Sequence, residues 1–300
     1  VAILNNLIKC KYNVVGVITA PDRPAGRGRK LQESAVKEYA LTQGLKVLQP
    51  NNLRDNSFLE DLKSLEANLQ VVVAFRMLPQ VVWQMPKYGT FNLHASLLPN
   101  YRGAAPINWA IINGETETGV TTFYIDDKID TGEIILQEKT NILPDETAGS
   151  LHDKLMVLGA GLVVRTIQLI EEDKVVVRKQ GDVQELKSAN KIYKETCMID
   201  WNRPIGEIYD HIRGLSPYPA AWTTLHNSGE TSTLKIYSVI KVREAHSFKN
   251  GILVHDKKSM KVAVQGGFLE LLEVQLPGKR KMKVHELLNG TTLSETAHVH

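Results

Sequence analysis

The sequence has few cysteines and no apolar run long enough to cross a membrane. Only two of its 300 residues, Cys10 and Cys197, are cysteines, and their positions fit no metal-binding or redox spacing. This excludes a disulfide-rich scaffold and indicates a reducing compartment in which both thiols stay unpaired. The stretch from Leu69 to Phe75 falls far short of the roughly 20 apolar residues that a membrane helix needs. Because the first residues also show no secretory pattern, we expect the bacterial cytoplasm, with an organelle as the alternative.

Patterns that bind metals or dinucleotides are also missing. None of the nine histidines forms the His-x-x-x-His or His-Glu-x-x-His pair that zinc hydrolases use. The terminal pair His298-Val299-His300 has no third ligand near it in the sequence. The segment Gly26-Arg27-Gly28-Arg29 lacks the third glycine and the strand-to-helix context of a dinucleotide fingerprint. The sequence therefore predicts neither a bound metal nor a dinucleotide site.

Charge is nearly balanced over the whole chain but is unevenly placed. The composition, 43% hydrophobic and 23% charged with a net charge of +3, is that of an ordinary globular protein. Residues 191–300 carry 15 Lys and Arg against 11 Asp and Glu, whereas the remaining residues carry 21 against 22. Two dense basic clusters lie at 23–30 and 279–283. Such clusters can bind phosphate chains, although a solvated surface is the more common explanation for any one of them.

Strands and helices alternate in the first half of the chain. We expect helices over 2–10, 34–43, 55–65, 79–84, 107–113 and 147–172, and strands over 13–19, 46–48, 69–75, 89–94, 120–125 and 133–139. Residues 21–30 are expected to form a loop because proline and glycine interrupt regular structure there. Strands that are apolar throughout, such as 69–75, indicate a Rossmann-like, mostly parallel sheet that is covered by helices on both faces.

The pattern changes after about residue 187. Short apolar runs at 233–242, 252–255, 261–264 and 268–275 alternate with turn residues, and one helix at 205–213 precedes them. This pattern is typical of a small antiparallel, OB-like β-barrel. We therefore expect an α/β domain over 1–174, a linker over 175–190 and a barrel domain over 191–300, as the length of the chain also suggests.

The stretch from Phe91 to Pro106 carries the strongest chemical signal. Asn92 and His94 are two residues apart on an extended segment, which places both side chains on one face. An imidazole titrates near neutral pH and can share a proton with a carboxylate such as Asp130, and an Asn amide can donate to a carbonyl oxygen. Ser96 is followed by a Leu-Leu-Pro turn rather than paired as a nucleophile, which favours direct transfer to an external nucleophile. The alternative explanations, a structural histidine and an Asx-turn at Asp130, remain open from these residues alone.

Three motifs together resemble the signature of the folate-dependent formyltransferases. They are Phe91-Asn-Leu-His-Ala-Ser-Leu-Leu-Pro99, Tyr101-Arg-Gly-Ala-Ala-Pro-Ile107 and Asp130-Thr-Gly132. The segment Pro21-Asp-Arg-Pro-Ala-Gly-Arg-Gly28, the basic barrel, Ala189-Asn190-Lys191-Ile192 and Ile199-Asp200-Trp201 resemble the parts of the family that act on initiator tRNA. The resemblance covers nearly the whole chain.

The resemblance implies a reaction and its residues. It implies transfer of a formyl group from 10-formyltetrahydrofolate, as co-substrate, to the amine of methionine on initiator tRNA, which leaves tetrahydrofolate. Asn92 and His94 match the pair that contacts the formyl oxygen, and Asp130 matches the carboxylate that sets the charge of that histidine. The folate-binding residues implied by the match are Ser96, Leu97, Leu98, Pro99, Phe75, Met77 and Leu78. Phe75-Arg76-Met77 departs from the usual Tyr-Gly pattern of the family.

The resemblance also implies where nucleic acid would bind. The loop residues Arg23, Arg27, Arg29 and Lys30 match an insertion that approaches the acceptor end of the tRNA. The barrel would contact the tRNA backbone through Lys279, Arg280, Lys281 and Lys283. The family normally begins with a strand and a Gly-Thr-Pro turn, so we expect that the first strand of the sheet precedes Val1. We expect a monomer, and the rival hypothesis is a formyltransferase that acts on a sugar nucleotide or a purine precursor.

Overall fold

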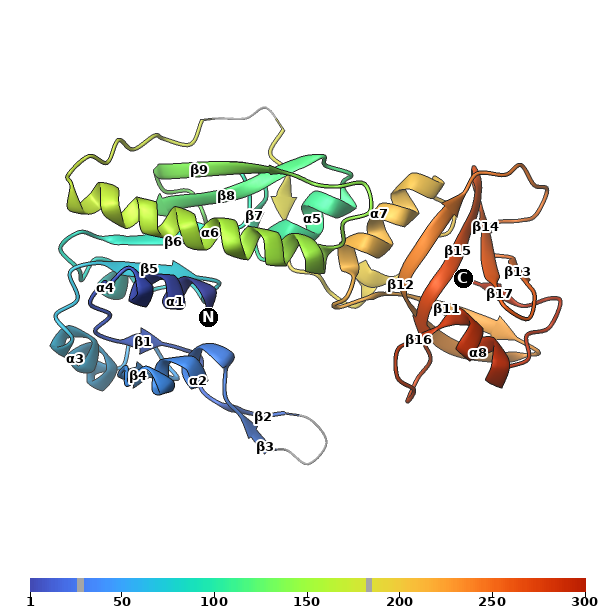
Figure 1. Cartoon of the computed structure of the whole chain (residues 1–300), viewed down its shortest axis with the longest axis horizontal. Helices are drawn as coiled ribbons and strands as arrows, with labels where there is room; N and C mark the ends of the chain where they lie inside the picture. The colour runs from blue at the N-terminus through green and yellow to red at the C-terminus, as the bar shows by residue number, and fades with distance from the viewer. Residues whose placement is uncertain (26–29, 182–184) are drawn as a thin grey trace. The chain divides into compact units, whose positions relative to one another are not determined.

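The computed structural model describes residues 1–25, 30–181 and 185–300 (Figure 1). These residues form two compact units, each of which is discontinuous in sequence. The first unit consists of residues 1–102, 119–139 and 154–186, and the second consists of residues 103–118, 140–153 and 187–300. The fold class predicted from the sequence is confirmed, because α/β structure in the N-terminal half is followed by an antiparallel barrel.

Short strands and their connecting helices make up the N-terminal part of the chain. In chain order they are α1 (Ala2–Lys9), β1 (Val17–Ile18), β2 (Arg23–Ala25), β3 (Lys30–Gln32), α2 (Ala35–Thr42), β4 (Val47–Leu48), α3 (Asn56–Ser64), β5 (Gln70–Val73), α4 (Gln80–Trp83), β6 (Thr90–His94), β7 (Arg102–Gly103), α5 (Pro106–Ile112), β8 (Glu117–Tyr124), β9 (Ile134–Asn141) and α6 (Ala148–Glu171). Local signals fix several ends: Ser34 caps α2 by accepting a hydrogen bond from the Lys37 amide at 3.2 Å. Pro106 occupies the first turn of α5, where its missing N–H costs nothing.

Three separate ladders are described within the first unit, and one of them is the antiparallel pair of β2 and β3. β1 pairs with β4 in parallel, and a four-stranded sheet has the order β5-β6-β8-β9. Within that sheet β5 and β6 are parallel, whereas β6 and β8 are antiparallel. β6 is therefore flanked by strands on both sides, and its carboxyl end is a rigid place from which to present side chains.

Several strand predictions are wrong in extent or burial. The strand expected over 13–19 is only β1, since its partner β4 offers two residues for pairing. The strand expected over 69–75 is β5, which is half-buried rather than fully buried, and Val73 is exposed. β5 lies at the end of its ladder and has one neighbouring strand, so one of its edges is not covered by β-structure. The loop expected over 21–30 contains the antiparallel pair β2 and β3.

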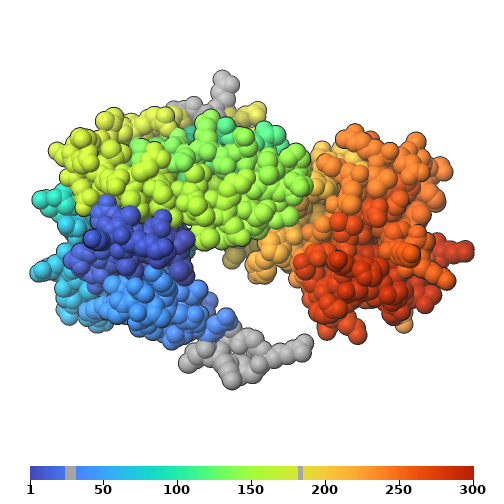
Figure 2. Space-filling model, in the orientation of Figure 1, coloured from blue at the N-terminus to red at the C-terminus, as the bar shows by residue number. Residues whose placement is uncertain are grey.

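The core of the first unit lies between the four-stranded sheet and its helices. Phe91 of β6 is fully buried against Val163 and Ile167 of α6. α1 contributes Ile3 and Leu7 to the same cluster, and its other face is at the surface (Figure 2). The apolar residues of α6 recur at helical spacing, as the sequence predicts, because one stripe of the helix must cover the sheet.

The second unit is built on an antiparallel barrel-like sheet. After β10 (Ser188–Ala189), its elements are a 3-10 turn (Glu195–Cys197), α7 (Ile205–Leu215), β11 (Ala221–Asn227), β12 (Glu230–Val242), β13 (Leu253–His255), β14 (Met260–Val264), β15 (Gly267–Gln275), β16 (Met282–Lys283), α8 (Val284–Gly290) and β17 (His298–Val299). The strand order is β13-β14-β15-β12-β11-β17, and β16 pairs with β15. Its apolar interior is closed on one side by α7, whose Ile208 and Ile212 are buried.

Sequence reading misses several elements of this unit, and the longest of them are β11 and α8. β11 is joined to β12 by the two-residue turn Ser228-Gly229, in which both residues have positive φ (52° and 83°). A Ser-Gly pair between alternating residues is a recognisable hairpin signal, so β11 could have been predicted. α8 spans only seven residues, which is too short for a periodic pattern to stand out.

One half-buried histidine of α7, whose Nε2 atom is buried, gives a testable pH dependence. Burial lowers the pKa of His211, the Arg203 charge acts in the same direction, and hydrogen bonds to the Cys197 and Met198 backbone oppose it. A histidine with a lowered folded-state pKa stabilises the fold above the unfolded value of about 6.5, and this contribution is lost as pH falls below it. We expect the free energy of unfolding of the barrel to fall with a slope of up to about 1.4 kcal/mol per pH unit there.

This slope should be smaller in the His211→Gln variant. Urea unfolding at pH 8 and at pH 5, followed by tryptophan fluorescence, measures it, since Trp201 and Trp222 belong to this unit. His152 has an exposed side chain (61%), so His152→Gln serves as the matched control. Equal pH slopes in the His211 variant and in the unmodified chain would contradict the assignment.

Candidate active site

β6 places two of the expected catalytic side chains at its carboxyl end. In the register of β6 and β8, Asn92 lies opposite Phe123 and His94 lies opposite Thr121. Side chains two residues apart on a strand lie on the same face, so the two polar groups are adjacent on one side of the sheet. The strand expected from the sequence over 89–94 is therefore present with nearly the predicted bounds.

The imidazole of His94 lies between a backbone carbonyl and a carboxylate. Its Nε2 is 2.8 Å from the carbonyl oxygen of Tyr101, and its Nδ1 is 3.7 Å from Oδ2 of Asp130. A carbonyl oxygen can only accept, so Nε2 carries a proton and donates it. A second proton, on Nδ1, would face the Asp130 carboxylate. The side chains of His94 and Asp130 are 6% and 14% exposed, which shields this pair from solvent.

The amide of Asn92 has an unused acceptor. Oδ1 of Asn92 is buried and has no hydrogen-bond partner among the described residues. Leaving a buried polar atom without a partner costs about 1–3 kcal/mol, so such atoms in native structures call for an explanation. An Asn amide offers both a donor and an acceptor, and a bound substrate with complementary groups would satisfy it.

The loop that carries Asp130 has a specific backbone conformation. Asp130 itself has a φ of 56°, in the left-handed region that non-glycine residues rarely adopt. The side chain of Asp126 organises the loop by accepting from the Lys128 amide at 3.0 Å and from the Thr131 hydroxyl at 2.8 Å. At Gly132 a Cβ would lie 1.7 Å from the Tyr124 carbonyl oxygen, so no other residue fits there. The sequence suggests an Asx-turn at Asp130. The structure has this turn four residues earlier, at Asp126, whose carboxylate accepts from the Lys128 amide.

The turn after β6 is held by side chains of β8 and β9. The Ser96 hydroxyl donates to the Asn100 carbonyl at 2.7 Å, which excludes it as a free nucleophile in this arrangement. Thr121 donates to the Ser96 carbonyl at 2.7 Å and accepts from the Leu98 amide at 3.2 Å. Gln137 donates to the Leu98 carbonyl at 2.8 Å. Sequence reasoning missed both Thr121 and Gln137, because only the tertiary pairing brings them to this turn.

The predicted folate-binding residues fall into buried and exposed groups. Leu98 packs in a small core cluster with Phe123 and Ile134, so its side chain serves packing. Leu97 and Pro99 are half-buried. Phe75 and Leu78 pack against the cluster of α3 and α4, whereas Met77 is 66% exposed.

Arg76 ties this segment to the chain after β4. Its guanidinium donates to the carbonyl oxygens of Pro50 and Asn51 at 2.5 and 2.8 Å and lies 5.6 Å from the centre of the Phe75 ring. The unusual Phe-Arg-Met sequence therefore has a local structural role.

The antiparallel pair of β2 and β3 is fastened at both ends to one lysine. Lys37 of α2 pairs with Asp22, just before β2, and its Nζ lies 2.8 Å from the carboxylate of Glu33, just after β3. Gln49 donates to the second Asp22 oxygen at 2.9 Å. The hydrogen bond from Lys37, followed by that from Gln49, lowers the pKa of the Asp22 carboxyl.

Four basic residues were predicted on this loop. The side chain of Arg23 is exposed, and Lys30 is the first residue of β3. Arg27 and Arg29 lie outside the described residues.

The basic cluster at 279–283 divides into paired and unpaired cations. Arg280 lies 3.0 Å from Glu286, and Lys281 lies 2.8 Å from Glu273. Lys279 and Lys283 form no ion pair with any residue that the structure describes. The sequence could not predict this pairing, because both carboxylates come from elements that only the fold places beside the cluster.

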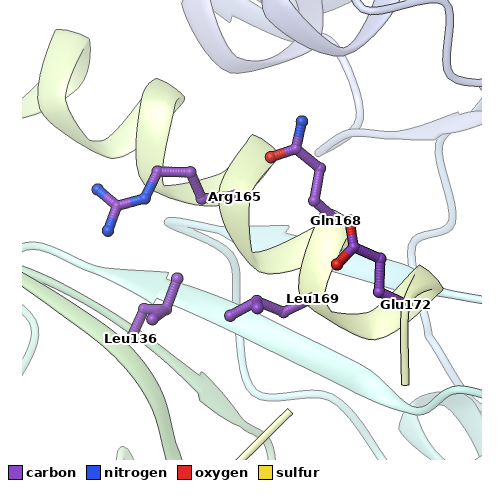
Figure 3. Close-up of a pocket in the computed structure, with 5 residues that line it drawn as sticks. All are labelled: Leu136, Arg165, Gln168, Leu169 and Glu172. Atoms are coloured by element: carbon purple, nitrogen blue, oxygen red, sulfur yellow. The ribbon is translucent and has the colours of Figure 1, made fainter. Parts of the chain in front are cut away.

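A surface cavity of about 350 Å³ lies elsewhere on the first unit, between β9 and α6 (Figure 3). Leu136 belongs to β9, and Arg165, Gln168 and Leu169 belong to α6. Arg165 also pairs with Glu138 at 2.6 Å. None of the predicted site residues lines this cavity.

The described residues include neither a cluster of metal-binding side chains nor a membrane-spanning helix. Over 1–25, 30–181 and 185–300, no group of three or more His, Cys, Asp or Glu side chains could hold a metal ion. Over the same residues, no helix combines the length and the apolarity that crossing a membrane requires.

Comparison with known proteins shows the same family over both halves of the chain. Residues 1–167 match the family described as formyl transferase, and residues 191–292 match the formyl transferase C-terminal domain. The methionyl-tRNA formyltransferase of Flavobacterium johnsoniae is 59% identical over 300 residues, which cover 100% of this chain and 95% of that protein. The methionyl-tRNA formyltransferase of Bacteroides thetaiotaomicron is 55% identical over 297 residues, with 97% and 92% covered.

Solved structures show the same fold at lower identity. A sugar 3N-formyl transferase crystallised with dTDP and 5-N-formyl-THF aligns with a TM-score of 0.65 and 21% identity over 93% of this chain and 94% of that one. An N-formyltransferase from Helicobacter canadensis in complex with folinic acid and dTDP-3-aminofucose aligns with a TM-score of 0.64 and 21% identity, covering 90% and 93%. The resemblance read from the motifs of the sequence is thus confirmed, and the chain belongs to the formyl transferase family.

Proposed function

We propose that this chain transfers the formyl group of 10-formyltetrahydrofolate to the α-amino group of methionine on initiator tRNA. The observation that carries the proposal is 59% identity over the full chain with a methionyl-tRNA formyltransferase, together with the pairing of His94 and Asp130 beside Asn92. Such a reaction supplies formylmethionyl-tRNA for translation initiation. The likeness to sugar formyltransferases is at 21% identity and supports only the fold.

The three polar residues have distinct roles in this proposal. The amine nitrogen attacks the formyl carbon, the bond from that carbon to the folate nitrogen breaks, and one proton is transferred overall from the amine to the folate nitrogen. The Asn92 amide would donate to the formyl oxygen, and a proton on His94 Nδ1 would stabilise the negative charge that develops there. Asp130 would orient the imidazole through its contact with Nδ1 and assist removal of the proton from the amine. No protein nucleophile is required, which agrees with the bonding of Ser96 to the Asn100 carbonyl.

Substrate binding would involve residues outside this group. We assign the folate to the Ser96–Pro99 turn and the 75–78 segment, with Leu98 and Phe75 supporting its walls from the core side. We assign the acceptor end of the tRNA to the loop after Asp22, and the tRNA backbone to residues 191–300. A protein that acts on bacterial initiator tRNA would work in the cytoplasm.

One test of the proposed function concerns the catalytic pair His94 and Asp130. His94→Ala should lower kcat for formylation of methionyl-tRNA by about 100-fold or more, because charge stabilisation and proton transfer are both lost. Asp130→Asn should lower it in the same direction while it preserves the volume of the side chain. Single-turnover formylation with 10-formyltetrahydrofolate measures the rate, and filter binding of tRNA is the control. Unchanged turnover in either variant would contradict the assigned roles.

The second prediction concerns the basic loop. Arg27→Ala should weaken the binding of initiator tRNA and reduce the slope of log Kd against log salt by about 1, as expected for one lost phosphate contact. Arg54 is exposed on the same unit and has no assigned role, so Arg54→Ala is the matched control. The KM for 10-formyltetrahydrofolate should stay constant. An equal effect of both variants would mean that only net charge matters.

The third prediction concerns the paired cations of the barrel. Replacing Glu273 and Glu286 by Gln releases Lys281 and Arg280, so tRNA should bind more tightly and with a steeper salt dependence. Glu230 and Glu295 are exposed on the same unit, and their double Gln variant changes the net charge equally. Electrophoretic mobility shift assays at several salt concentrations compare the two. If both double variants bind alike, the 279–283 cluster is not a tRNA contact.

A further inference from the structure

A single glutamine outside the motifs is hydrogen-bonded to the backbone of the Asp130 loop. Nε2 of Gln180 donates to the carbonyl oxygens of Asp130 and Gly132 at 2.9 and 2.8 Å. Its Oε1 accepts from Nε and Nη2 of Arg102 at 3.1 and 2.6 Å. Both ends of the amide are therefore used, and the side chain is locked in one orientation.

The loop needs such support because its backbone is not in a relaxed conformation. Asp130 has positive φ without being a glycine, which costs free energy that surrounding contacts must offset. Asp126 holds the loop from within through Lys128 and Thr131. Gln180 is a contact from a distant part of the chain, 50 residues away from Asp130.

Arg102 connects the same glutamine to the other side of the imidazole. It directly follows Tyr101, whose carbonyl accepts the hydrogen bond from His94 Nε2. Asp130 faces Nδ1 on the opposite side of the ring. Gln180 thus joins the two backbone segments between which His94 lies.

Gln180 is itself held in place by the sheet. Residue 178 forms an antiparallel bridge with Ile134 of β9, with N–H to O distances of 2.8 and 2.9 Å. The Arg178 guanidinium also donates to the side-chain oxygen of Gln137. This bridge holds the segment that carries Gln180 against β9 of the first unit.

We propose that Gln180 is a positioning residue that sets the separation of His94 and Asp130 by clamping the Asp130 loop to the Tyr101–Arg102 segment. It touches neither substrate nor the reacting atoms in this account. The roles of His94 and Asp130 rest on the proposed function, but the clamp itself is a statement about geometry. Two readouts therefore test it, one with substrate and one without.

Gln180→Glu separates the hydrogen bonds to the Asp130 loop from those to Arg102. A glutamate keeps the size and the pairing with Arg102, but it cannot donate to the carbonyl oxygens of Asp130 and Gly132. Gln180→Ala removes both sets of hydrogen bonds. Gln168 is exposed on α6 of the same unit, so Gln168→Glu is the control for added charge.

We expect Gln180→Glu to lower kcat for methionyl-tRNA about 10- to 100-fold, as displaced catalytic groups do, with KM values changed less than about twofold. Gln180→Ala should lower it at least as much, and Gln168→Glu should leave it unchanged. If kcat is unaltered in Gln180→Glu while the unmodified chain is active, the clamp does not position the catalytic pair. A loss confined to KM would also overturn it.

The readout without substrate is the imidazole ¹⁵N spectrum of His94 at fixed pH, assigned with His94→Gln. The His94 signals should move in Gln180→Glu and Gln180→Ala but not in Gln168→Glu. The melting temperatures of Gln180→Glu and Gln168→Glu should be the same. Unmoved His94 signals would overturn the proposal whatever acceptor the enzyme uses. If the unmodified chain does not formylate methionyl-tRNA but the His94 signals move in the Gln180 variants, the proposed acceptor is contradicted and the clamp is supported.

Discussion

The placement of one imidazole between a carbonyl and a carboxylate is the constraint on which the rest of the site depends. Nε2 of His94 is committed to the Tyr101 carbonyl, so only Nδ1 is left to share a proton with Asp130. Because both side chains are shielded from solvent, their interaction is stronger than it would be in water. The orientation of the ring is therefore set before any substrate arrives, and catalysis needs little reorganisation.

The fold meets this constraint by joining three segments that are far apart in sequence. β6 presents Asn92 and His94, the turn fastened by Thr121 returns the chain to Tyr101, and the loop after β8 brings in Asp130. The turn after β6 is fixed by Thr121 of β8, and the Asp130 loop is fixed by Asp126 and Gln180. The parts that we assign to tRNA binding differ in kind, since the β2–β3 pair held by Lys37 and the 279–283 cluster carry surface charges.

Local and periodic features were predictable from the sequence, and pairings across the fold were not. The spacing of Asn92 and His94, the apolar stripe of α6 and the alternating strands of the barrel are each encoded within a few neighbouring residues. The terminal position of β5 in its ladder and the ion pairs of Arg280 and Lys281 depend on which elements become neighbours. Gln180 has no local signature at all, because its hydrogen bonds reach two carbonyl groups that lie 50 and 48 residues earlier in the chain.

The central claim is that initiator tRNA, and not a small amine, is the acceptor. The most direct measurement gives the purified protein 10-formyltetrahydrofolate with methionyl-tRNA and a dTDP-linked aminosugar in the same reaction and follows which amine is formylated. The account predicts formylmethionyl-tRNA, with no product from the sugar nucleotide at equal concentration. Formylation of the sugar nucleotide with methionyl-tRNA left unchanged would contradict it.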